Sequence, residues 1–179
     1  IVGERLELSR VLKLTRRTQI IFVICAGLFL AGLIASIVLS DIGARVTGAG
    51  MIALAAWLLR NDLARKTVRQ TGLPRYIAAS LLAGYVWLAV GGALALAFGG
   101  VVAGLHYDAL LHAVFLGFVM SMIFAHAPII FPAVLGRPIV YRPVFYSHLA
   151  LLHLSLILRI SGDLALSPTG APAEGGVSG

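Results

Sequence analysis

The chain has 179 residues, of which 60% are hydrophobic and 12% charged, and its mean hydropathy is +0.99. An ordinary soluble domain carries about 25% charged residues, so this composition excludes a soluble globular domain and predicts an integral membrane protein. The net charge of +7 would favour nucleic acid as a partner of a soluble protein, but here the basic residues lie at the ends of apolar stretches, so we expect no nucleic-acid partner.

Residues 1–17 differ from the rest, because leucine and valine interleave there with arginine and glutamate. The pattern predicts a basic amphipathic segment that lies on anionic lipid, and a solvated basic lead-in explains it equally well. Since the chain begins at Ile1 rather than at a methionine, we expect a processed or truncated piece of a longer protein.

Five apolar stretches follow within residues 18–166, each long enough to cross a membrane, since a hydrocarbon core of about 30 Å needs about 20 apolar residues in a helix. A very tight turn is expected between the first two, and a flexible tail rich in Gly, Pro and Ser at 167–179. The sequence therefore predicts an all-α, polytopic helical bundle in a lipid bilayer, with five transmembrane helices at about 20–40, 42–59, 76–98, 109–133 and 144–160.

The basic residues indicate how the bundle is oriented. Twelve of the fourteen Lys and Arg residues fall before the first span, between the second and third, or between the fourth and fifth, and only Arg45 and Arg159 fall on the other side. The positive-inside rule then predicts a cytoplasmic N-terminus and a C-terminus outside.

Small and helix-breaking residues make further predictions. Five glycines in the second and third spans are expected at helix-packing positions rather than in a phosphate-binding loop, because no strand precedes them. Two prolines in the fourth span remove backbone donors and should kink or end that helix. The lone Cys25 excludes an internal disulfide and a metal site built from cysteines. The glycines are Gly48, Gly50, Gly84, Gly91 and Gly92, and the prolines are Pro128 and Pro132.

The histidines are the candidates for chemistry, because an imidazole in lipid is costly without a partner. His112 and His126 lie fourteen residues apart in the fourth span. At about 100° per residue they share one face within roughly 40°, separated by about 21 Å, a spacing that two-haem membrane bundles use. The fifth span carries His148 and His153, and His106 falls in the loop before the fourth span.

A short turn joins the fourth and fifth spans, which predicts antiparallel neighbours. His126 and His148 then lie at similar depth, where two imidazoles could ligate one haem iron or share a copper ion. Arg159, near the other boundary, could pair with a haem propionate or with Asp163, four residues on. The predicted cofactor site therefore consists of His112, His126, His148, His153 and Arg159, with His126 and His148 as the metal ligands and no catalytic residue.

Structural roles compete with this interpretation for every one of these residues. A membrane histidine is often a hydrogen-bonding strut to a backbone carbonyl, and His106 beside Tyr107 and Asp108 is expected to be structural or solvated. Arg159 and Asp163 could form no more than an ion pair at a helix end.

The segments LHAVFLGFVMSMIFAHAPIIFPAVLGRP and FYSHLALLHLSLILRISGDL carry the four histidines of the spans. With their helix-borne histidines, they resemble the NnrS family of bacterial membrane proteins over roughly residues 60–163. The resemblance implies haem or copper, a response to nitric oxide and a place in the bacterial inner membrane. It makes His112 and His126 the first candidate ligands, and His148 and His153 the second.

Three functions remain open at this point. The first is a redox or nitric-oxide-responsive membrane protein that holds haem or copper, which leaves open whether it is an enzyme. The second is a non-catalytic subunit or assembly factor of a larger respiratory or pigment complex, with other membrane subunits or further copies of itself as partners. The third, a small transporter, lacks the inverted repeat typical of that class.

Overall fold

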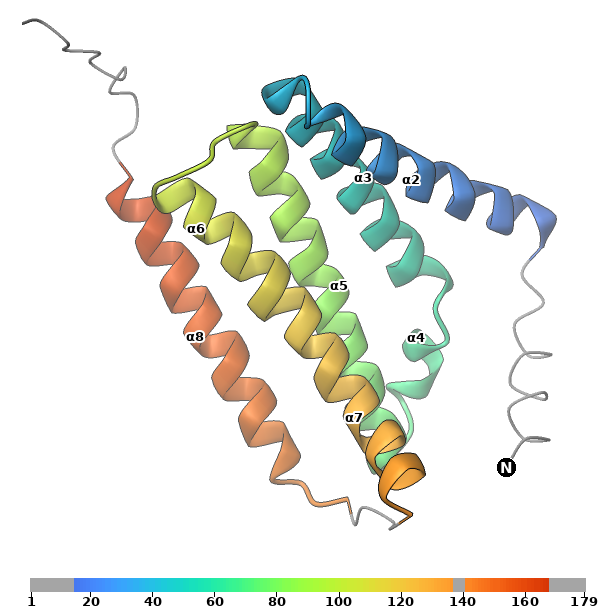
Figure 1. Ribbon diagram of the computed structural model, residues 1–179. Helices are drawn as coiled ribbons and strands as arrows, with labels where there is room; N and C mark the ends of the chain where they lie inside the picture. Colours follow the sequence, from blue (N-terminus) through green and yellow to red (C-terminus); the bar gives the residue numbers. More distant parts are fainter. Residues whose placement is uncertain (1–14, 137–140, 168–179) are drawn as a thin grey trace, which may run out of the picture.

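The computed structural model describes residues 15–136 and 141–167, and in that part of the chain every regular element is a helix (Figure 1). Five helical stretches are long and apolar enough to cross a membrane, which confirms the predicted all-α membrane bundle. The elements are α2 (Arg16–Ala35), α3 (Ser40–Asn61), the short α4 (Ala64–Thr67), α5 (Leu73–Phe98), a continuous rod made of α6 (Leu105–Leu111), the π-helical η1 (His112–Val119) and α7 (Met120–Leu135), and α8 (Phe145–Leu166).

The long helices run alternately up and down and lie side by side in chain order, with α5 in the middle (Figure 1). Helix α2 packs on α3, α3 on α5, and α5 on η1 and α7, whereas α8 packs on α6 and η1. One end of the bundle holds α4, the starts of α2, α5 and α8, and the ends of α3 and α7. We call it the basic end, because it carries Arg16, Arg17, Arg60, Arg65, Lys66, Arg69, Arg75 and Arg142.

Glycines let these helices approach closely, as the sequence predicts for the five packing positions. All five are buried. A Cβ atom at Gly48 would lie 2.5 Å from the carbonyl oxygen of Gly92, and one at Gly50 would lie 2.5 Å from the Cα of Phe29. Backbone therefore meets backbone at both faces of α3, and this contact fixes α3 between α2 and α5.

At the end opposite the basic end, Arg45 and Asp41 of α3 cap the C-terminus of α5 through hydrogen bonds. Arg45 donates from Nη1 to the carbonyl of Leu96 at 2.7 Å and from Nε to Asp41 at 3.0 Å, while Asp41 accepts the N–H of Gly100 at 3.2 Å. A guanidinium at a helix C-terminus satisfies carbonyls that lack intrahelical donors and opposes the helix dipole.

The fourth span departs from the sequence predictions in two ways. Helix α7 continues through Pro128 and Pro132 and ends at Leu135, where Gly136 takes a left-handed conformation (φ 65°), so the prolines do not end the helix. Residues 112–119 form a π-helix. A bonding pattern of i to i+5 accommodates about one extra residue, which turns all later side chains by about 100°. The expected common face of His112 and His126 assumed α-helical spacing, and that premise does not hold here.

The basic N-terminal segment and the tail lie almost wholly outside the described residues, which begin at Thr15 and end at Ser167.

Candidate functional site

His126 is exposed on α7, in a groove whose described lining residues all belong to the same rod. Its Nδ1 lies 2.7 Å from the carbonyl oxygen of Met122. Because a carbonyl only accepts, Nδ1 of the neutral ring carries the proton and Nε2 keeps a free lone pair. The groove around it has a volume of about 360 Å³ and is almost entirely apolar; it is lined by Val119, Met122, Ile123, His126, Ala127, Ile130 and Phe131.

His148 lines a second, mostly aromatic groove between α7 and α8, with Tyr76 of α5 beside it. This groove has a volume of about 220 Å³, below the range of about 300–1,000 Å³ typical of small-molecule pockets. A tetrapyrrole would therefore fit only if α7 and α8 moved apart. The groove is lined by Tyr76, Phe124, Ala127, Pro128, Phe131, Phe145 and His148.

The two predicted metal ligands thus line neighbouring grooves that share Ala127 and Phe131. Helix α8 packs against α6 and η1 rather than α7, so the turn between the fourth and fifth spans does not make α7 and α8 close neighbours at this depth. Within residues 15–136 and 141–167, no group of three or more His, Cys, Asp or Glu side chains could hold a metal ion.

His153 of α8 pairs with Trp87 of α5. The indole Nε1–H donates to Nδ1 of His153 at 2.9 Å, and the two ring planes differ by only 18°. Because an indole only donates, Nδ1 must accept and the proton of the neutral ring is on Nε2. That Nε2 is buried and finds no partner among the described residues. A metal would need the lone pair that this tautomer lacks at Nε2, so the geometry suits a link between α5 and α8.

We expect Trp87→Phe to weaken this link, because it removes the only donor that reaches Nδ1 of His153 in the described structure. The free energy of unfolding in detergent should fall by about 1 kcal/mol, and the ¹⁵N signal of Nδ1 should lose its hydrogen-bonded position. Trp57→Phe is the matched control, because Trp57 donates instead to the carbonyl of Thr18. An unchanged His153 signal in Trp87→Phe would contradict the assignment.

His112 and His106 have local roles in this structure. His112 donates from Nδ1 to the carbonyl of Asp108 at 2.7 Å, the same one-turn-back contact that His126 makes, and it is half-buried. His106 lies against Phe98, with 3.8 Å between ring centroids. That contact joins α6 to the end of α5, as the structural interpretation of His106 expects.

Arg159 of α8 contacts two carboxylates, Asp163 in its own helix and Asp108 in α6. Its Nε lies 3.2 Å from Oδ2 of Asp163 and its Nη2 lies 3.6 Å from Oδ2 of Asp108. The Asp163 side chain is only 5% exposed, and its Oδ2 has an ion-pair contact without hydrogen-bond geometry. The pairing with Asp163 that the sequence offers as an alternative is therefore present, and Asp108 is a partner that the sequence did not indicate.

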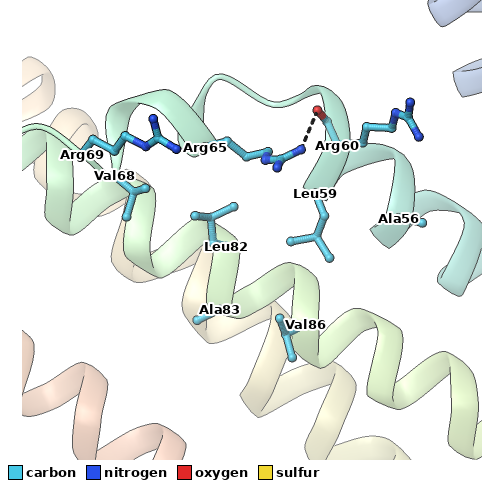
Figure 2. A pocket seen from close by; sticks show the side chains of 9 residues that line it. All are labelled: Ala56, Leu59, Arg60, Arg65, Val68, Arg69, Leu82, Ala83 and Val86. Carbon is cyan, nitrogen blue, oxygen red and sulfur yellow. Dashed lines mark hydrogen bonds between the residues drawn. The ribbon is translucent and has the colours of Figure 1, made fainter.

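Sequence reasoning also missed a hollow at the basic end, which three arginines line above an apolar floor, with Arg60 pointing outward (Figure 2). Its volume is about 650 Å³, and its lining comes from α3, α4, the segment after α4, and α5. The sequence does contain a signal for this hollow, the cluster of basic residues between the second and third spans. That cluster was interpreted only as an indication of how the chain is oriented in the membrane. We call this hollow the arginine notch; it is lined by Ala56, Leu59, Arg60, Arg65, Val68, Arg69, Leu82, Ala83 and Val86.

Comparison with known proteins gives a family match. A family model described as Domain of unknown function (DUF8744) matches residues 1–179. No curated protein and no solved structure matches the chain. The resemblance to the NnrS family was wrong, since a different family covers the full length. Unrelated membrane helices are built from the same few apolar residues. A similarity that consists of such residues and a few scattered histidines is therefore weak evidence for a shared family.

Proposed function

Because the chain belongs to the family described as Domain of unknown function (DUF8744), whose description names no chemistry, we propose a function from the geometry: a multi-pass membrane protein that holds a haem-type cofactor through Nε2 of His126. The proposal includes the orientation that the positive-inside rule favours, with the basic end in the cytoplasm.

The observation that carries the proposal is the state of the His126 ring. It is exposed on a face where the bilayer would lie, its Nδ1–H is bound to the carbonyl of Met122, and no residue that the structure describes bonds to its Nε2. Metal-ligating histidines in proteins commonly donate their other N–H in this way, which fixes the tautomer and the ring orientation. An imidazole nitrogen left bare in hydrocarbon is costly, so a ligand on Nε2 would remove that cost.

The surroundings of His126 favour haem over copper. Side chains such as Ile123 and Ile130, which are 48% and 52% exposed, offer an open apolar face to a flat and mostly apolar group. A protein copper site needs two or three nitrogen or sulfur ligands together. The described residues hold no such cluster of three, and His148 lines the neighbouring groove. His126 would hold the haem iron as the one protein ligand among the described residues, and the iron would supply a binding position for a small molecule or for a residue of another subunit.

A haem titration of the detergent-purified protein tests the proposal. We expect a Soret band that saturates at one haem per chain, and at least about tenfold weaker haem binding in His126→Leu, because the axial ligand is lost. His106→Leu is the matched control, because it removes an imidazole at the opposite end of the bundle. No saturable band in the wild type, or an unchanged one in His126→Leu, would refute haem ligation by His126.

The non-catalytic subunit is the second candidate, and one observation favours it. The groove around His126 is built by a single rod, with residues spaced three and four apart, which is the pattern that a partner helix packs against. On this proposal the wild type binds no haem. Ile123→Cys, in a Cys25→Ser background, would then cross-link to a membrane partner or to a second copy.

A further inference from the structure

The arginine notch exists because α3 is shorter than α5 toward the basic end. Gly48 meets Gly92, yet α3 ends at Asn61 while α5 begins at Leu73. From that contact α3 continues for 13 residues and α5 for 19 toward the basic end, so α5 extends about 9 Å further at 1.5 Å per residue. Helix α4 packs on α5 and covers part of the length by which α5 extends beyond α3. The remaining hollow has α5 as its floor.

The arginines of the notch form no ion pair within the described residues. Arg60, Arg65 and Arg69 all line it, and no carboxylate does. The nearest acid along the chain, Asp62, lies beside the notch, in a neighbouring hollow that the three arginines also line. Asp62 accepts the hydroxyl of Tyr85 at 2.6 Å and the N–H of Ala64 at 2.8 Å rather than a guanidinium N–H. The other described acids, Asp41, Asp108 and Asp163, lie toward the opposite end.

The guanidinium groups stand on the rim of the notch, above its apolar floor. In Figure 2, Arg65 extends above Leu82 and Leu59, Arg69 reaches toward it from one side, and Arg60 points away on the other. Among the described residues, Nη1 of Arg65 makes only a long contact, at 3.5 Å, to the carbonyl of Arg60. Its remaining donors are therefore available to an anion.

The depth of the notch matches the boundary between head groups and acyl chains. Arg60 follows Arg45 by fifteen residues in α3, about 22 Å along the axis, which is less than the hydrocarbon thickness of about 30 Å. An arginine at that depth extends its head group toward the interface while its stem stays in the apolar layer. The floor residues, Leu82, Ala83 and Val86, lie within a membrane-spanning helix.

We propose that the arginine notch binds the phosphate of an anionic phospholipid, with Arg65 and Arg69 as the principal ligands and an acyl chain along Leu59, Leu82 and Val86. Guanidinium groups bind phosphate through paired N–H donors, and basic pockets between transmembrane helices on the cytoplasmic side suit anionic head groups. The apolar floor favours a lipid over a soluble phosphate compound, which shares the same anionic chemistry but has no acyl chain. This site is independent of the histidines.

Native mass spectrometry of the full chain in neutral detergent tests the site, because a micelle has no charged surface to attract lipid diffusely. Phosphatidylglycerol is the probe, with phosphatidylcholine and soluble glycerol phosphate as the other arms. We expect one retained phosphatidylglycerol per chain and about 10- to 30-fold weaker binding in the double variant Arg65→Gln, Arg69→Gln. The matched control is Arg75→Gln, Arg142→Gln, which removes two charges from the same end outside the notch and should change binding less than twofold.

Three outcomes would overturn the proposal: equal losses in both double variants, no loss in either, or retention of phosphatidylcholine to the same extent as phosphatidylglycerol. Displacement of the lipid by an equal concentration of glycerol phosphate would assign the notch to a soluble phosphate compound instead. Should the arginine variant fail to fold, Ala83→Trp fills the floor and leaves every charge in place. Unchanged lipid retention in Ala83→Trp would then refute the acyl-chain site.

Discussion

Gly48→Val should strongly destabilise the bundle, because it forces α3 and α5 apart. A Cβ at Gly48 would lie 2.5 Å from the carbonyl oxygen of Gly92 and 2.8 Å from the backbone N of Leu96. Backbone atoms of a packed helix cannot rotate away, so α3 and α5 must separate. Overpacking costs about 1–3 kcal/mol where side chains can adjust, and more where they cannot. We therefore expect a loss of about 3 kcal/mol or more, measured by denaturant unfolding in detergent.

The same substitution at two other glycines gives stabilities with which the Gly48 variant can be compared. Gly27→Val in α2 is the control, because no atom lies within 4 Å of a Cβ placed there. Gly91→Val should fall between the two, since its close neighbours, Val114 and Met51, present side-chain ends that can move. Equal stability of the Gly48 and Gly27 variants would mean that the contact between α3 and α5 is looser than the structure has it.

The helices could be predicted from the sequence because their cause is local. A long uncharged stretch has to satisfy its own backbone in lipid, and only a helix does so within one segment. Even the tight first turn follows, since α2 ends at Ala35 and α3 begins at Ser40. Gly43 makes that turn possible, because its missing side chain leaves room for the backbone of Ser36.

The candidate site was less predictable, because it depends on rotation about a helix axis and on which helices touch. The π-helix at 112–119 lies where Gly117 receives the Trp87 ring and where Val114 packs at Gly91. Nothing in a run of apolar residues specifies that insertion, yet it changes the direction of His126 relative to His112. The packing of α8 against α6 and η1 likewise depends on tertiary contacts rather than on local sequence. Because of this packing, His126 and His148 line separate grooves.

The arginine notch was hidden for a different reason. Each of its cations is visible in the sequence, but a count of charges by side treats them as equivalent. They come together because α3 stops short of the basic-end terminus of α5, and because α4 and the segment after it place Arg65 and Arg69 above Leu82 (Figure 2). The alignment of α3 along α5 is set by the glycine contacts between them, which a hydropathy profile does not report.

Arg159→Met should be the most destabilising change at a charged residue of the described structure. It leaves the Asp163 carboxylate, only 5% exposed, without the guanidinium that lies 3.2 Å away. Removing one partner of a fully buried pair costs about 3–5 kcal/mol. Because the Arg159 side chain is 50% exposed, solvent screens part of the interaction, and we expect a loss of about 2–3 kcal/mol in denaturant unfolding. Asp108→Asn should cost less than about 1 kcal/mol, since both members of that contact are half exposed.

A double-mutant cycle separates the ion pair from a cofactor role for Arg159. If the pair is structural, Asp163→Asn in the Arg159→Met background restores most of the lost stability, because the uncompensated charge is gone, and haem binding in the titration is the same in all four proteins. A haem held by His126 would lie at the other end of the bundle from Arg159, which contacts Asp108 of α6. Weaker haem binding in Arg159→Met, not restored by Asp163→Asn, would therefore contradict this placement and point to a propionate contact. Additive losses of stability with unchanged haem binding would contradict both roles, because neither the carboxylate nor the cofactor would then depend on the guanidinium.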